Sequence, residues 1–145
     1  MGKRVILTAG ILGLLFGCGW LAWWIQQEPP AEEPVQIILE GEAARTEFLR
    51  AQGQPESRCI TAETVQLPVS VDDAYKDYAA LQDAQKLPLT AHLGETATRY
   101  TYTQSSSEQD TFRTELLVDE NQMLIGAVQY DCTAAEEMTA LLKSR

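Results

Sequence analysis

The chain has 145 residues, with 11 Lys+Arg against 21 Asp+Glu and a formal net charge of -10. Its apolar residues are concentrated in the first 25 positions, so about 120 residues are left to fold in water. That length is enough for one domain and excludes a two-domain enzyme. With Lys3 and Arg4 left out, the remainder is still more acidic, and its field repels phosphate backbones. Nucleic acid is therefore not an expected partner.

The segment at residues 5–25, VILTAGILGLLFGCGWLAWWI, contains no charged or amide side chain. As a helix it spans about 31 Å, which matches the hydrocarbon core of a bilayer. A single segment in lipid can pair all its backbone polar groups only as a helix. The sequence therefore predicts an N-terminal transmembrane signal-anchor helix within residues 1–25, with the lipid bilayer as its partner.

Charges near the ends of this segment predict its orientation. Lys3 and Arg4 precede it, whereas the next basic residue is Arg45. The positive-inside rule then places the N-terminus in the cytoplasm and the C-terminal part outside. Tryptophan is enriched where a membrane meets water, so we expect an outer interface at Trp20, Trp23 and Trp24. The predicted location is a single-pass position in the cell membrane.

Three further interpretations of the segment stay open. Cleavage by a signal peptidase would release the rest of the chain. The residues Leu15 to Cys18 resemble a lipobox, which would make the protein a lipoprotein-type envelope sensor acylated at Cys18. The spacing of Gly13 and Gly17 is compatible with a weak helix-mediated dimer.

Composition changes sharply after the apolar segment. Residues 26–41 are predicted to be an acidic linker, because QQEPPAEEP combines prolines and glutamates with almost nothing to bury. Residues 42–145 are predicted to form one extracytoplasmic α+β domain. In this interpretation the surface of the domain is exposed to water rather than to lipid.

The first half of that domain predicts two helices and a strand. A helix is expected over 42–52, with Phe48 and Leu49 on the apolar side and Arg45 away from it. Residues 58–67 are rich in β-branched side chains and predict a half-buried strand. A second helix is expected from a capping box at Ser70 and Asp73 to about Lys86.

The second half predicts a meander of strands. Residues 95–103, 112–119 and 123–130 alternate apolar and polar side chains with period two. A capping box at Thr133 and Glu136 predicts a short closing helix. The expected fold class is α+β, with a mainly antiparallel four-stranded sheet and two or three helices packed on one face.

Two motifs carry a resemblance to a known family. They are Y-x-x-L-Q at residues 78–82 and G-x-x-x-x-R-Y-x-Y at residues 94–102. Together with the pattern around them, over about residues 42–132, the chain resembles the domain-of-unknown-function family 4830. The resemblance implies a short domain of Gram-positive bacteria that usually follows a membrane segment or lipoprotein signal. It implies no activity and no catalytic residue.

Cysteine and tyrosine provide the candidate sites. Cys59 and Cys132 are the only thiols outside the apolar segment, and a disulfide between them would suit an oxidising compartment if their strands were neighbours. The alternative is two separate thiols. Five tyrosines, including Tyr75 and Tyr130, could stack a sugar or peptide or simply fill the core. The expected ligand-facing groove contains Tyr100, Tyr102, Arg99 and Tyr78.

Catalytic signals are weak in this sequence. His92 is the only histidine, which excludes multi-histidine metal sites and leaves one imidazole that would need a serine from residues 105–107 as nucleophile. No metal, cofactor or catalytic residue is predicted. The expected function is a non-catalytic binding or structural module with an unknown extracytoplasmic protein or envelope ligand as partner. The alternative is a cell-envelope hydrolase or hydrolase subunit.

Overall fold

The computed structural model describes residues 33–104, 111–133 and 137–142. Contacts within the chain separate residues 1–33 from residues 34–145, and the account below concerns the second unit. The predicted membrane segment, its three tryptophans, Cys18 and the serines at 105–107 lie outside the described residues. No helix within the described ranges is long and apolar enough to cross a membrane.

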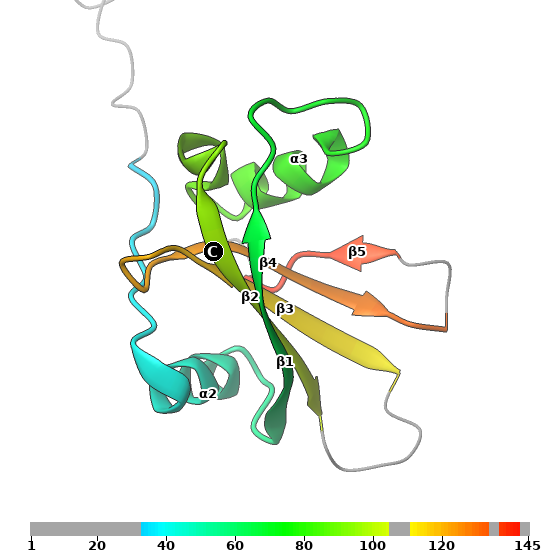
Figure 1. The fold of residues 1–145 in the computed structure, drawn as a ribbon. Coiled ribbons are helices and arrows are strands. Elements are labelled where there is room, and N and C mark those ends of the chain that lie inside the picture. Colours follow the sequence, from blue (N-terminus) through cyan, green and yellow to red (C-terminus); the bar gives the residue numbers. More distant parts are fainter. Residues whose placement is uncertain (1–32, 105–110, 134–136, 143–145) are drawn as a thin grey trace, which may run out of the picture. The chain divides into compact units, whose positions relative to one another are not determined.

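An antiparallel sheet forms the centre of the domain (Figure 1). Its described strands follow chain order as β1 (Ser57–Gln66), β2 (Thr96–Gln104), β3 (Phe112–Val118), β4 (Leu124–Asp131) and β5 (Met138–Thr139). The helices are α2 (Gly41–Ala51), α3 (Lys76–Ala84) and the short 3-10 helix η1 (Leu89–His92). The α+β class and the predicted meander are confirmed, and β5 is an addition.

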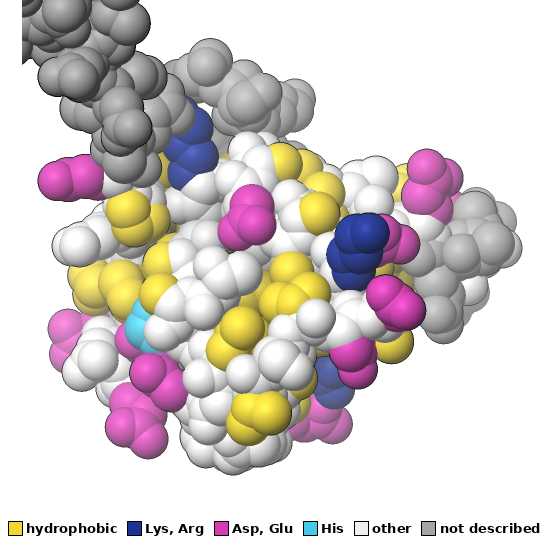
Figure 2. All heavy atoms as spheres, turned by 90° about the horizontal axis from the view of Figure 1, so that it is seen from above, with side chains coloured by type: hydrophobic (Ala, Val, Ile, Leu, Met, Phe, Trp, Pro, Cys, Tyr) yellow, Lys and Arg dark blue, Asp and Glu magenta, His cyan; other side chains and the backbone are white. Residues whose placement is uncertain are grey.

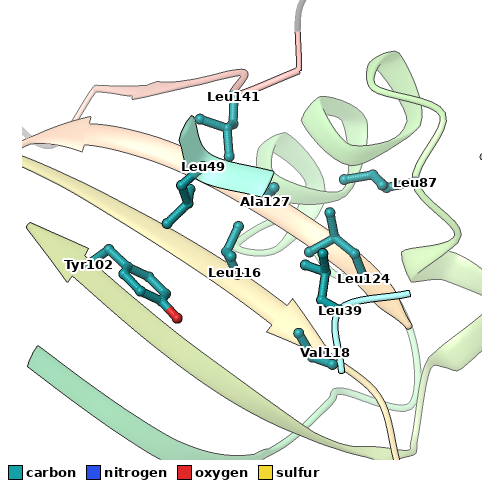
Figure 3. Packing of buried hydrophobic residues seen from close by; sticks show 9 residues of the cluster. All are labelled: Leu39, Leu49, Leu87, Tyr102, Leu116, Val118, Leu124, Ala127 and Leu141. Atoms are coloured by element: carbon teal, nitrogen blue, oxygen red, sulfur yellow. The ribbon is translucent and has the colours of Figure 1, made fainter. Parts of the chain in front are cut away.

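The two faces of the sheet pack against different helices. Register pairs Tyr100 with Leu116, and Leu116 with Ala127, so these side chains share one face, which we call the α2 face. Figure 3 shows its buried cluster: Leu39, Leu49, Leu87, Tyr102, Leu116, Val118, Leu124, Ala127 and Leu141. Arg99 pairs with Leu117 on the opposite face, the α3 face, where Tyr75 and Tyr78 pack against a second cluster. The prediction that the helices share one face is wrong.

Helix α2 confirms the predicted helix within one residue at each end. Leu49 is fully buried, and Gly53, at a φ of +89°, follows the helix in a backbone conformation that suits glycine. Arg45 was expected on the solvent side, yet only 7 % of it is exposed. Its guanidinium lies over the ring of Tyr100, 3.8 Å from the centroid, which explains how a charge fits on the buried side.

Helix α3 begins six residues after the predicted cap. The backbone N–H of Tyr75 donates to the Asp72 carboxylate at 2.9 Å, so this aspartate holds a turn and Ser70 does not cap a helix. The helix starts only at Lys76. Asp72 and Asp73 therefore precede the helix rather than occupy its first turn.

Strand β1 lies at the edge of the sheet and carries a bulge. Cys59 pairs with Tyr102 and Thr61 pairs with Thr101, which leaves Ile60 as the extra residue. Because the bulge shifts the alternation of side chains by one residue, Cys59 and Thr61 face opposite sides of the sheet. Cys59 lies on the α2 face, and Thr61 lies on the α3 face. Ile60 is 45 % exposed, so the predicted half-buried alternation fails at this point.

The predicted closing helix is wrong over the residues that are described. Met138 pairs with Tyr130 in β5, and the backbone N–H groups of Leu141 and Leu142 donate to Oε1 of Gln85 at 2.9 and 2.8 Å. Residues 134–136 lie outside the described ranges. The backbone groups that would bond to one another in a helix instead form hydrogen bonds with β4 and with the Gln85 side-chain amide.

Gln82 of α3 and Gln85, which directly follows the helix, take the place of a neighbouring strand beside β4. The Ala127 N–H donates to Oε1 of Gln82 at 2.7 Å, and Nε2 of Gln85 donates to the Ala127 carbonyl at 2.8 Å. Gln82 is fully buried. These bonds satisfy the outer backbone edge of β4 at a point that β5 does not reach.

The folded unit begins earlier than the predicted linker boundary at residue 41. The N–H of Leu39 donates to the Gln122 carbonyl at 2.7 Å, and the N–H of Leu124 donates to the Ile37 carbonyl at 2.8 Å. Leu39 is 2 % exposed. The apolar run at residues 35–39 therefore belongs to the domain.

Candidate functional site

A cavity of about 560 Å³ lies on the α3 face. Each strand contributes to its lining, with Val65, Arg99, Glu115, Tyr130 and Met138 as examples in strand order, and Tyr75 and Tyr78 close it on the side of α3. We call it the α3 cavity. Its volume falls within the roughly 300–1,000 Å³ typical of small-molecule sites.

The tyrosines at α3 form an aromatic wall. The rings of Tyr75 and Tyr78 lie with their centroids 5.2 Å apart and tilted by 46°. Gly126 makes room for this wall, because a Cβ there would lie 2.9 Å from the Tyr78 hydroxyl oxygen. Burial raises the pKa of both phenols, so they are protonated at neutral pH and can donate hydrogen bonds.

The polar groups of the cavity are partly paired with one another. Nη2 of Arg99 donates to the Glu63 carboxylate at 2.6 Å, and the Tyr130 hydroxyl donates to Glu115 at 3.2 Å. The hydrogen bond to Glu63 raises the pKa of Arg99, while burial and then Glu115 raise the pKa of Tyr130 to about 12. Among the described residues, Nε of Arg99 is buried and has no hydrogen-bond partner. The cavity thus presents a fixed cation and a carboxylate.

The predicted groove is divided between the two faces. Tyr78 and Arg99 line the α3 cavity, whereas Tyr100 and Tyr102 lie on the α2 face. Successive residues of a strand point to opposite sides, so Arg99 and Tyr100 cannot share a surface. Sequence reasoning missed Glu115, although a carboxylate beside the apolar run at 116–118 signals a polar position on one face.

The arginine on the α2 face is fully occupied. Nε of Arg45 donates to the Tyr102 hydroxyl and Nη2 donates to Glu42, both at 3.0 Å. The Tyr102 hydroxyl in turn donates to the same Glu42 carboxylate at 3.1 Å. Tyr102 is 1 % exposed. Arg45 and Tyr102 are thus buried and bonded to each other, and the cluster reaches the surface through Glu42, which is 52 % exposed.

The predicted disulfide does not form in this structure. Cys59 and Cys132 are both free thiols. Cys59 lies on β1, and Cys132 follows β4, so β2 and β3 stand between them. Three strand spacings amount to roughly 14 Å, about twice the greatest Cα separation that a disulfide spans. Burial raises the pKa of the Cys59 thiol, which favours its unreactive protonated form.

His92 lies outside the α3 cavity, beside two carboxylates. Its Nδ1 is 2.7 Å from a Glu95 oxygen and 4.0 Å from an Asp119 oxygen, and 15 % of its side chain is exposed. Within the described ranges, no hydrogen bond joins His92 to a serine or cysteine side chain. The same ranges contain no group of three or more His, Cys, Asp or Glu side chains suited to a metal ion.

Seen from above in Figure 2, hydrophobic side chains gather towards the middle of the surface, with acidic and basic side chains around them. In the loop before α3, Val69 is 85 % exposed and Val71 is 41 % exposed. Met138, which lines the cavity, is also 41 % exposed. Exposed apolar residues near a cavity are a common feature of binding surfaces.

Comparison with known proteins adds no relative. No family model, curated protein or solved structure matches the chain. The resemblance to family 4830 stays a prediction based on the two motifs.

Proposed function

We propose that the protein is a single-pass membrane protein whose outer α+β domain is a non-catalytic binding module, with the α3 cavity as its ligand site. The lining of this cavity is the observation that supports the proposal. It combines tyrosine rings with the side chains of Arg99 and Glu115, and the described lining includes no serine, threonine, cysteine, histidine or lysine. Such a set can orient a ligand by stacking and hydrogen bonding, and it lacks the hydroxyl, thiol and amine nucleophiles of serine, threonine, cysteine and lysine.

Cross-linking in intact cells tests the binding role. A photo-reactive amino acid that replaces Met138 would lie at the cavity. The same photo-reactive amino acid in place of Val35 would lie elsewhere on the domain. Both positions are 41 % exposed, so they form a matched pair. We expect a cross-linked product from position 138 and little from position 35. Equal yields at both positions, or no product at 138, would contradict the proposal.

The membrane topology rests on sequence features: the apolar run at 5–25, the basic residues before it and the tryptophans at its far end. Protease added to intact protoplasts should digest the acidic domain. Protection until lysis would contradict an outer location. The intact mass of the membrane-extracted protein distinguishes a retained anchor from signal-peptidase cleavage and from acylation at Cys18.

A hydrolase is the second candidate, favoured by the contact of His92 with Glu95. His92→Gln separates the two functions. The binding module keeps its cross-link at position 138 in this variant, whereas a hydrolase that depends on the imidazole loses turnover of its envelope substrate.

A further inference from the structure

The α3 cavity combines stacking surfaces with paired charges, and we propose that its ligand is a neutral oligosaccharide. This inference rests on the binding function proposed above. It adds the chemical class of the ligand, which is argued from the rings, the hydrogen-bonding groups, the charge balance and the direction of the cavity across the sheet.

The aromatic wall suits the flat, C–H-rich faces of sugar rings. Tyr75 directly precedes α3 and Tyr78 lies in its first turn, while Tyr130 belongs to β4, so rings border the cavity from two sides. Tyrosine offers an apolar face together with a polar tip. Tyr75 is only half-buried, which leaves part of its ring available to a ligand.

The hydrogen-bonding groups suit hydroxyls, which both donate and accept. The Arg99 side chain lines the cavity and is 42 % exposed, so its terminal nitrogens can donate to a ligand. Glu115 accepts one bond from Tyr130 through Oε1 and has a second oxygen that can accept from a ligand. A sugar with neighbouring hydroxyls can bond to a guanidinium and a carboxylate at once, and such charge-assisted bonds are the stronger ones.

The charge balance favours a neutral ligand. Arg99 stands between Glu63, with which it forms an ion pair, and Glu115, whose charge also acts on it. An anionic ligand would have to compete with two carboxylates for one guanidinium. A cationic ligand would meet Arg99 itself. The net charge of -10 on the chain adds a long-range repulsion for polyanions.

The direction of the cavity favours a glycan over an extended peptide. Its lining takes residues from all five described strands, so it runs across the strands over roughly 19 Å, four spacings of about 4.8 Å. A peptide that adds to a sheet lies along an edge strand, where its backbone forms the hydrogen bonds. Across a face those bonds are not available, whereas stacked rings need none.

Titration calorimetry on the full chain in lipid nanodiscs tests the proposal. The probes are a tetrasaccharide of N-acetylglucosamine, a tetrasaccharide of glucose, an anionic tetra-uronate and a capped tetra-alanine peptide. We expect one or both neutral sugars to bind, and Arg99→Gln to weaken that binding by about 10- to 100-fold because a charge-assisted donor is lost. Arg50→Gln is the matched control, because Arg50 also pairs with a glutamate but lies on α2. Its affinity should equal that of the unchanged chain.

Two tyrosine variants make the test independent of the arginine. Tyr75→Leu removes a ring at a half-exposed position and should weaken sugar binding by about tenfold, whereas Tyr75→Phe keeps the ring and should stay within about threefold. Equal affinity of the leucine variant and the unchanged chain would overturn the stacking argument. Unchanged thermal unfolding of each variant excludes misfolding as the cause.

The outcomes separate this inference from the proposed function. If the tetra-uronate or the peptide binds in an Arg99-dependent manner and neither neutral sugar does, the ligand class is wrong while the binding module stands. If no probe binds but position 138 still cross-links in cells, the oligosaccharide is again overturned and the module stands. Absence of both probe binding and the cross-link overturns both.

Discussion

Each face of the sheet carries an arginine together with tyrosines and a glutamate. These groups pack into the core on one face and border a cavity on the other. On the α2 face, Arg45 directs two donors to Tyr102 and Glu42, and only 9 % of its side chain is exposed. On the α3 face, Arg99 pairs with Glu63 but remains 42 % exposed beside a cavity. An arginine, tyrosines and a glutamate can therefore either close a core or leave a site open.

The origin of each arginine explains the difference. Arg45 comes from a helix that lies over the sheet, so its guanidinium reaches down onto the ring of Tyr100 and is covered by its own helix. Arg99 comes from the sheet itself, and the wall above it is set by α3 and its first turn, where Tyr75 and Tyr78 leave space. The position of a helix over a face thus decides whether polar groups are satisfied internally.

The largest expected contrast between the faces is in core truncation. Leu116 is completely buried on the α2 face, and Leu116→Ala should lower the free energy of unfolding by about 3 kcal/mol through lost contacts and a new void. Leu117 is 4 % exposed but borders the α3 cavity on one side, so Leu117→Ala loses fewer contacts and should cost about half as much. Urea unfolding of both variants measures the difference, and equal losses would contradict the contrast.

Replacement of the two arginines should give the second-largest contrast in the free energy of unfolding. Arg45→Met leaves the buried Tyr102 hydroxyl without its guanidinium partner and should lower the free energy of unfolding by about 1–3 kcal/mol. Arg99→Met removes a partly exposed ion pair and should cost less than about 1 kcal/mol. The comparison fails if Arg99→Met proves the more destabilising of the two in chemical denaturation.

A third test alters the wall of the cavity. Gly126→Ala places a methyl group 2.9 Å from the Tyr78 hydroxyl oxygen and 3.4 Å from Cβ of Leu117, which should cost about 1 kcal/mol. Tyr78→Phe removes the nearest atom, so the double variant should recover part of that loss. A double-mutant cycle from unfolding data measures this coupling, and strict additivity would show that the hydroxyl is not the obstacle.

The smallest effect concerns alkaline pH. The pKa of Tyr130 is raised from its ordinary 10.0 to about 12 in the folded protein, chiefly by burial. Its contribution to stability is fully present below pH 10 and is lost as the pH rises towards 12, because the unfolded chain releases the proton first. Phenolate absorbance of the folded protein should therefore show a step near pH 12 that Tyr130→Phe removes, while the absorbance change near pH 10 is the same in both proteins. An ordinary transition assigned to Tyr130 would contradict the shift.

The sequence was a good guide to the strands because period-two alternation is a direct consequence of burying one side of a strand. The segments at 95–103, 112–119 and 123–130 match β2, β3 and β4 closely. It was a poor guide to β1, where the bulge at Ile60 changes the phase without any local signal. The closing helix failed because the capping pattern after Thr133 says nothing about Gln85, more than 40 positions earlier, which holds Leu141 and Leu142.

Only part of the candidate site could be predicted, because local sequence patterns do not report contacts between distant residues. Tyr78 and Arg99 were expected in the groove and line the cavity, but Tyr100 and Tyr102 were grouped with them on proximity in sequence. Arg45 was expected in water, because a charge on a helix usually is, and only its contacts with Tyr100 and Tyr102 explain its burial. Such contacts join residues more than 50 positions apart, which no local pattern reports.

The two edges of the sheet differ in how their backbone groups are paired. The outer side of β4 is occupied in turn by residues 37–39, by the amides of Gln82 and Gln85 and by β5. Strand β1 has a strand neighbour on one side only within the described residues. Strand β5 is the other edge of the sheet and has only two residues, whereas β1 leaves ten residues along an open edge, so β1 is the longer template for edge-to-edge pairing.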